Sequence, residues 1–282
     1  MLLRPKWLQA SPTMLSENEN SVMKKFIIVA PARSGSRMLL ERLGSHPDLH
    51  VQGELLNSEL IDKISILRKI YLKIIQFCGR ERAHYNLQFN GYNFAQVVDN
   101  LVWGHSYRKF DAAGFKIIAY QWLQLSSDQQ ENFFQNYDFK VILLRRKNTL
   151  SHLVSTRQAE LNGYRHRLNG QPALDLPAVD LTFEDLKRFH RNIFVRASVI
   201  NSHFAVFPMI ETTYEDLVSD PDQENRRLLE FLGVRDVPLK EALAKNSNLD
   251  LSRRIVGFEE FAQSLRGTGY EHLLPDDYTA KA

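Results

Sequence analysis

A polar segment, Arg33-Ser34-Gly35-Ser36-Arg37, follows the apolar run 26–30 and precedes a helical pattern that restarts at Met38. A strand, a tight turn and a helix N-terminus leave several backbone N–H groups free, and the helix dipole favours an anion there. The segment adds arginine and two hydroxyl side chains to these donors. It therefore predicts a pocket for a phosphate or sulfate ester.

A second basic segment begins Arg145-Arg146-Lys147, directly after the strand-like run 139–144. Ser155 lies nine residues after Arg146, on the helix expected over 148–160. A dianion is bound well by an arginine fork together with a hydroxyl donor. A solvated basic helix start is the alternative, but the macrodipole disfavours cations at a helix N-terminus. Each of the three basic residues is a candidate for the anion contact.

The first segment differs from the Walker phosphate loop. That loop reads G-x-x-x-x-G-K-[ST], and its lysine and hydroxyl serve the phosphates and Mg²⁺. Here there is one glycine, Gly35, with no lysine after it, and Arg33 lies ahead of the turn. A P-loop kinase with a degenerate loop is one alternative. Another is an ordinary strand–helix turn with serine N-caps.

The order Arg33-Ser34-Gly35-Ser36 resembles the 5′-phosphosulfate loop of sulfotransferases that use 3′-phosphoadenosine-5′-phosphosulfate (PAPS), usually P-R-S-G-[TS]-[TS]. Ala32 stands where the family proline is common, and Arg37 replaces the second hydroxyl. The R-x-N-x-L-x-x-x-x-S spacing from Arg146 to Ser155 resembles bacterial carbohydrate sulfotransferases of the Nod-factor and trehalose type. The resemblance implies PAPS as the donor, 3′,5′-adenosine bisphosphate as the product, and no metal.

The resemblance also implies roles for single residues. Arg33, Ser36 and the N–H groups of residues 34–36 would hold the 5′-phosphate, and Arg146 with Ser155 the 3′-phosphate. The C-terminal segment, with Arg253 and Arg254, would return over the cofactor. The cofactor-binding residues so implied are Arg33, Ser34, Gly35, Ser36, Arg37, Arg145, Arg146, Ser155 and Arg266.

Glu54 sits where carbohydrate sulfotransferases of this type carry the glutamate that deprotonates the acceptor hydroxyl. The resemblance thus implies Glu54 and Arg33 as the catalytic residues. A surface carboxylate opening the helix expected over 55–77 is the alternative, since acids are favoured at a helix start. His50 and His105 are the other candidate bases.

We expect the acceptor to be a carbohydrate, a glycolipid or another small molecule with a hydroxyl group. Several aromatic residues can stack on a sugar ring or pack in the core. They are Tyr85, Phe89, Tyr92, Trp103 and Tyr107. A non-catalytic nucleotide-binding or scaffold protein that kept the fold is the remaining alternative.

Basic residues concentrate between Arg145 and Gly170, although the chain as a whole carries a formal charge of only +3. This stretch has six lysines and arginines and one carboxylate, Glu160. It lacks the interleaved aromatic residues of a single-strand nucleic-acid platform, and no DNA- or RNA-binding motif accompanies it. A polyanionic cofactor or an acidic acceptor explains the charge, so we expect no nucleic-acid partner.

The totals describe an ordinary globular chain of 282 residues, 44% of them hydrophobic. The single cysteine, Cys78, excludes an internal disulfide and is expected to be a core thiol. No run of about 18 apolar residues predicts a membrane span, and the N-terminus lacks the pattern of a signal peptide. We expect a cytoplasmic protein with a flexible lead-in (1–22), one domain (23–275) and a short tail (276–282).

Apolar runs alternate with helical patterns, which predicts a three-layer α/β fold with a parallel sheet flanked by helices, P-loop NTPase-like. Ligands of such sheets bind at the carboxyl ends of the strands, where both basic segments fall. The helix expected over 55–77 can pack in the core or against a second subunit of a homodimer. Strands are expected at 26–30, 48–52, 114–120, 139–144 and 205–212, and helices at 36–43, 55–77, 94–103, 128–136, 148–160, 182–204 and from 221.

Overall fold

The computed structural model describes residues 22–55, 94–104, 107–123, 125–162, 176–240 and 250–275. Several of the sequence predictions lie outside these ranges. They are the lead-in before residue 22, the helix expected after Leu55, Cys78, Tyr85, Phe89, Tyr92, His105, most of the loop expected over 162–180, and the tail over 276–282.

A parallel sheet of five strands forms the centre of the described chain, in the order β2-β3-β1-β4-β5. The predicted α/β fold with a parallel sheet flanked by helices is confirmed. The strands are β1 (Lys24–Ala30), β2 (Leu49–Glu54), β3 (Ala112–Ile118), β4 (Lys140–Arg145) and β5 (Met209–Thr213). Apolar runs such as F-I-I-V-A in β1 are buried because helices cover both faces of the sheet.

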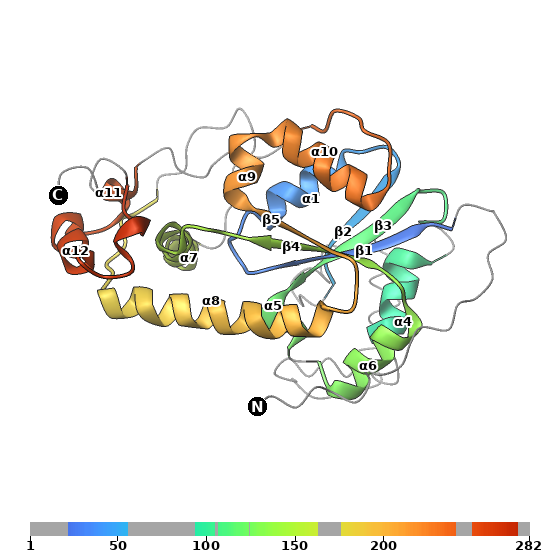
Figure 1. Ribbon diagram of the computed structural model, residues 1–282, viewed down its shortest axis with the longest axis horizontal. Coiled ribbons are helices and arrows are strands. Elements are labelled where there is room, and N and C mark those ends of the chain that lie inside the picture. The colour runs from blue at the N-terminus through green and yellow to red at the C-terminus, as the bar shows by residue number, and fades with distance from the viewer. Residues whose placement is uncertain are drawn as a thin grey trace.

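Helices lie on both faces and beyond the strand ends (Figure 1). One face, called here the α1 face, carries α1 (Ser36–Gly44), α9 (Tyr214–Ser219) and α10 (Pro221–Leu232). The other, the α8 face, carries α4 (Phe94–Val98), the π-helical turn η2 (Asp99–Trp103), α5 (Ala119–Trp122), α6 (Ser127–Asn136) and α8 (Phe183–Phe204). Beyond the strand ends lie α7 (Thr149–Asn162), α11 (Leu251–Arg254), α12 (Phe258–Leu265) and the 3₁₀ turn η4 (Glu271–Leu273).

Three groups of buried apolar side chains hold these layers together. Ile28 and Leu39 belong to the group on the α1 face, and Trp122 and Phe133 to an aromatic group on the α8 face. A third group joins α7 and α8 to the C-terminal helices, with Leu153 and Leu265 at its centre. The third group fixes the tail beside the strand ends, where ligands of parallel sheets bind.

All five strands differ by one or more residues from their predicted bounds, and the bounds of two have a clear local cause. β3 ends at Ile118 rather than residue 120, because the Gln121 side chain accepts a hydrogen bond from the Ile118 N–H and starts α5 there. β5 begins only at Met209, since Phe207 N–H still bonds Phe204 at the end of α8. The expected helix start at Pro221 is confirmed, with the Asp220 side chain capping it.

The strand order sets a sequence of side chains along the carboxyl edge of the sheet. Glu54 ends β2, Lys116 lies near the end of β3, and the β1–α1 loop (residues 31–35) leaves the centre. Arg146 follows β4, and Tyr214 follows β5. Neighbouring strands are ~4.8 Å apart, so these groups occupy one row along that edge.

Candidate active site

The β1–α1 loop makes a sharp turn that opens the N-terminus of α1. Arg33 and Gly35 both have positive φ angles, 63° and 88°. The buried Ser34 hydroxyl donates to Pro31 O at 2.8 Å and closes the turn. The N-cap of α1 is Gly35, with no side-chain capping bond, so the alternative of a serine-capped turn is wrong. The first N–H groups of α1 are thus left for a ligand or solvent.

Tyr214 packs directly against this turn. A Cβ atom added at Gly35 would lie 2.5 Å from Tyr214 Cδ2. Position 35 therefore requires glycine for two reasons: its backbone is left-handed, and the tyrosine ring leaves no space for a side chain. The contact ties the β1–α1 loop to α9, which begins at Tyr214.

Two carbonyl groups of the same loop accept hydrogen bonds from side chains on α7 or just before it. His152 Nε2 donates to Ala32 O at 2.6 Å, and Arg146 Nη1 lies 3.4 Å from Arg33 O. Because the carbonyl is the acceptor, the His152 ring carries its proton on Nε2. Burial lowers the pKa of His152 to about 4, and the charges of Arg146 and Arg33 act in the same direction. A neutral histidine thus joins the two basic segments.

Arg146 is the member of its basic cluster that faces the loop. Its guanidinium lies over the Tyr214 ring, 4.6 Å from the centroid. Burial lowers its pKa, and Nε is buried without a hydrogen-bond partner among the described residues. Arg145 instead pairs with Glu211 at 3.3 Å, and Lys147 with Asp216 at 2.7 Å.

The C-terminal segment brings a further arginine to the same place. Arg254 donates twice to the Gln158 side chain on α7, at 3.1 and 2.7 Å. Burial, and after it the nearby charge of Arg146, lowers the pKa of Arg254 to about 10. Gln158 follows Ser155 on the same helix, and Ser155 is partly exposed. Arg254 is thus held against the middle of α7, close enough to Arg146 for that charge to lower its pKa, and Ser155 lies three residues before Gln158 on the same helix.

Of the other residues predicted for the cofactor site, two belong to the first turn of α1 and two to the C-terminal segment. Ser36 is buried as the first residue of α1. Arg37 is about half exposed and pairs with Glu41 at 2.5 Å. Arg253 and Arg266 are exposed, and the described residues show no contact from the Arg266 side chain to either basic segment.

Glu54 lies on the α1 face, at the side of the loop away from Arg146. Its Oε1 accepts a hydrogen bond from Lys116 Nζ at 2.5 Å. Lys116 pairs in register with Ile28, which belongs to the α1-face core. Burial has the largest effect and lowers the pKa of Lys116, whereas Glu54 raises it. The charges of Arg37 and Arg33 lower this pKa as well. The pair is therefore close to the β1–α1 loop.

The other candidate base points to the opposite side of the sheet. His50 is in register with Ala113, an α8-face core residue, and its ring stacks on Tyr107 at 4.2 Å. Trp103 is likewise a core residue, with its indole N–H bonded to Ala113 O. Among the described candidates, the geometry favours Glu54 as the base.

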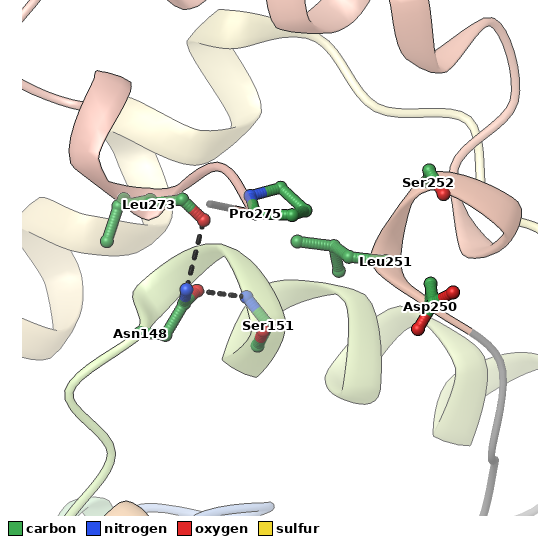
Figure 2. A pocket seen from close by; sticks show the side chains of 7 residues that line it. All are labelled: Asn148, Ser151, Asp250, Leu251, Ser252, Leu273 and Pro275. Carbon is green, nitrogen blue, oxygen red and sulfur yellow. Dashed lines mark hydrogen bonds between the residues drawn. The ribbon is translucent and has the colours of Figure 1, made fainter. Parts of the chain in front are cut away.

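A pocket of about 430 Å³ lies between the start of α7 and the C-terminal segment (Figure 2). The Asn148 side chain accepts from the Ser151 N–H and donates to Leu273 O, so it is already satisfied. The residues lining the pocket are Asn148, Ser151, Asp250, Leu251, Ser252, Leu273 and Pro275. They include a carboxylate and no lysine or arginine, so this pocket is unsuited to a phosphate.

Sequence reasoning missed four residues that organise the site. They are Lys116, His152, Gln158 and Tyr214. A lysine inside the apolar strand G-F-K-I-I was the one available signal. The other three carry no local pattern that separates them from ordinary helix residues.

The sulfotransferase domain family matches residues 23–250 of this chain. The chain therefore belongs to the sulfotransferase family, whose members are transferases. No curated protein matches its sequence.

Three solved structures are similar to this chain at low sequence identity. A sulfotransferase from Alicyclobacillus acidocaldarius is 16% identical, covers 91% of this chain and 98% of its own, and has a TM-score of 0.43. A sulfotransferase domain from the curacin biosynthetic pathway is 17% identical, covers 89% of each chain, and has a TM-score of 0.47. Mouse sulfotransferase SULT7A1 complexed with PAP is 14% identical, covers 92% and 89%, and has a TM-score of 0.43.

Two features are absent from the described residues. No helix there is both long and apolar enough to cross a membrane. Within the same ranges, no group of three or more histidine, cysteine, aspartate or glutamate side chains is arranged to hold a metal ion.

Proposed function

We propose that the protein transfers a sulfuryl group from PAPS to a hydroxyl of a carbohydrate, glycolipid or other small-molecule acceptor, by in-line displacement. One observation carries the proposal. Arg146, the β1–α1 loop and Glu54 follow one another along the carboxyl edge of the sheet, from β4 to β1 to β2. Along this edge, the proposed site for the 3′-phosphate comes first, the proposed site for the 5′-phosphosulfate second and the proposed base third. The transfer requires this order.

The charges of the site fit a nucleotide with two anionic groups. The charge of Arg146 lowers the pKa of Arg254, and Arg146 Nε is buried with no hydrogen-bond partner in the described part of the chain. A dianion between them would relieve both penalties, and Ser155 would add a hydroxyl. We assign the 3′-phosphate of PAPS to this place.

The β1–α1 loop fits the 5′-phosphosulfate group. The N–H groups at the start of α1 have no side-chain cap, so they are free to bind the 5′-phosphate together with Ser36. Arg33 would neutralise the charge that grows on the bridging oxygen as the sulfur–oxygen bond breaks. One such oriented donor contributes about 3 kcal/mol to transition-state stabilisation. Arg37 would add to the local positive field.

When bound, PAPS supplies the activated sulfuryl group, and the transition state resembles that of phosphoryl transfer. The protein's part is to position the groups and to move one proton. Glu54 accepts the proton of the acceptor hydroxyl, while Arg33 stabilises the departing phosphate oxygen.

Several finer assignments stay predictions of the sequence. They are the bacterial carbohydrate type of the enzyme, the cytoplasmic location, the single domain over 23–275 and the possible homodimer. The carbohydrate acceptor is supported by the glutamate base at Glu54. Of the aromatic residues considered for sugar stacking, Trp103 is buried in the core and Tyr107 packs on His50.

The experiment is calorimetric titration of the protein with 3′,5′-adenosine bisphosphate and with ATP. We expect tighter binding of the bisphosphate, because its 3′-phosphate meets Arg146. A preference for ATP would overturn the proposal in favour of a kinase. Radiolabelled PAPS then tests turnover, and tight bisphosphate binding without any release of sulfate would indicate a non-catalytic binding protein.

A further inference from the structure

Lys116 is a charged residue in the middle of a buried sheet. It lies on β3 between apolar residues and is only 5% exposed. Its register partners are Ile28 on β1 and Glu54 on β2. Its ammonium group donates to Glu54 Oε1 at 2.5 Å, across the two strands.

The surroundings of the pair are strongly positive. Burial lowers the pKa of Lys116, and the charges of Arg33 on the loop and Arg37 on α1 lower it further. Only Glu54, on β2, acts in the opposite direction among the groups that shift it. Arg37 is itself partly compensated by Glu41 on α1. A lysine held charged in such a place needs its carboxylate partner.

Stability alone is a poor reason for this arrangement. Burying two charges costs several kcal/mol per ion, and replacing a buried ion pair by apolar residues is often neutral or stabilising. An apolar residue at position 116 would continue the core formed by Ile28 and its neighbours. The pair therefore points to a task at the site beside it.

We infer that Lys116 is a positioning residue for the general base, holding the Glu54 carboxylate beside the β1–α1 loop through its charge-assisted hydrogen bond. This inference rests on the proposed function. In the transfer, the acceptor oxygen forms a bond to sulfur, the bond from sulfur to the 5′-phosphate oxygen breaks, and the acceptor proton goes to Glu54. Glu54 then releases that proton to water.

The first test measures the carboxyl group directly and needs no substrate. In protein labelled with ¹³C at the glutamate side-chain carboxyl carbon, the Glu54 signal is the one that disappears in Glu54→Gln. We expect this signal to titrate about one to three pH units higher in Lys116→Met than in the unmodified protein, because an adjacent cation has been removed. An unchanged midpoint would overturn the inference.

The second test follows turnover with water as the acceptor, as release of sulfate from radiolabelled PAPS. We expect Lys116→Met to lower kcat about tenfold near pH 6, with a smaller loss at about pH 8 and an unchanged KM for PAPS. Lys116→Arg, which keeps the charge, should restore part of the rate. Equal losses at all pH values would assign Lys116 a structural role only and contradict the inference.

Lys140→Met is the matched control. Lys140 is a partly buried lysine at the start of strand β4, and it donates to Phe231 O at the opposite end of the sheet. It should change neither the Glu54 titration nor the pH dependence of turnover. If Lys116→Met does not fold, Lys116→Gln supplies the same two measurements.

Different results would contradict the proposed function and the proposed role of Lys116. If the unmodified protein neither binds 3′,5′-adenosine bisphosphate nor releases sulfate, the proposed function is wrong, whatever the titration shows. If it does both and the Glu54 midpoint is the same in the two proteins, only the role of Lys116 is wrong.

Discussion

The Arg146 guanidinium lies over the Tyr214 ring, 4.6 Å from the ring centroid, and the same ring also packs against Gly35. One aromatic side chain thus spaces the two basic segments of the site. Arg146 follows β4, Gly35 belongs to the β1–α1 loop, and Tyr214 begins α9 after β5. Three neighbouring strands therefore determine one distance, that between the two anion sites.

Arg146→Gln tests whether this arginine binds a 3′-phosphate. We expect the affinity for 3′,5′-adenosine bisphosphate to fall about ten- to a hundredfold, because a charge-assisted hydrogen bond contributes about 1.5–3 kcal/mol. The affinity for 5′-AMP, which lacks the 3′-phosphate, should fall much less. Calorimetric titration with both nucleotides measures the difference.

Arg157→Gln is the control for Arg146. Arg157 is an exposed arginine on α7 that pairs with Glu160 on the protein surface. Its substitution should leave both affinities within about twofold of the unmodified protein, as exposed pairs contribute little. Equal losses for the two nucleotides in Arg146→Gln would contradict a role at the 3′-phosphate.

Gly35→Ala tests the packing of the loop on Tyr214. The new Cβ would meet the ring at 2.5 Å, and the left-handed backbone adds about 1–2 kcal/mol of strain. We expect a Tm several degrees lower and weaker nucleotide binding, both measured on the same preparation. Gly44→Ala is the matched control, since nothing lies within 4 Å of its added Cβ. A Gly35→Ala protein as stable as that control would show that the turn tolerates a side chain.

Glu54→Gln tests the base. We expect sulfate transfer to fall about 10²–10⁴-fold, the usual contribution of a general base. Binding of 3′,5′-adenosine bisphosphate should be nearly unchanged, because Glu54 lies on the acceptor side of the loop. Glu160→Gln, an exposed glutamate on α7, should keep both properties. Transfer that survives in Glu54→Gln would exclude this carboxylate as the base.

The sequence was sufficient for those parts of the fold that depend on local patterns. The apolar run 26–30 is buried as β1, and the helix expected over 182–204 is α8, with Thr182 as its N-cap. Both basic segments follow parallel strands, so their position at one edge of the sheet was predictable. These predictions needed only periodicity and turn residues.

The partners inside the site could not be predicted, because they depend on strand order and register. Lys116 meets Glu54 only because β3 lies between β2 and β1, a fact that no short-range pattern contains. The same holds for Tyr214 beside Gly35, which are far apart in the chain. Which of three consecutive basic residues faces the loop was also undecided, because it depends on where β4 ends and α7 begins.

His152 gives the protein a specific sensitivity to acid. Its pKa is lowered from 6.5 to about 4 in the folded state, so between these values the unfolded state binds more protons. The free energy of unfolding should therefore fall as the pH falls through this window, by about 3 kcal/mol from this group. The contribution is fully present above pH 6.5 and is lost as the pH approaches 4.

His152→Gln tests this prediction. The glutamine amide can still donate to Ala32 O but does not titrate, so the variant should lose less stability between about pH 7 and pH 5 than the unmodified protein. Denaturant unfolding at the two pH values measures the difference. An identical loss in both proteins would mean that other groups cause the acid sensitivity. Because the imidazole is buried against the charges of Arg146 and Arg33, its protonation must also disturb the loop. Nucleotide binding by the folded protein should then weaken only as the pH approaches 4, where the folded-state imidazole takes up its proton.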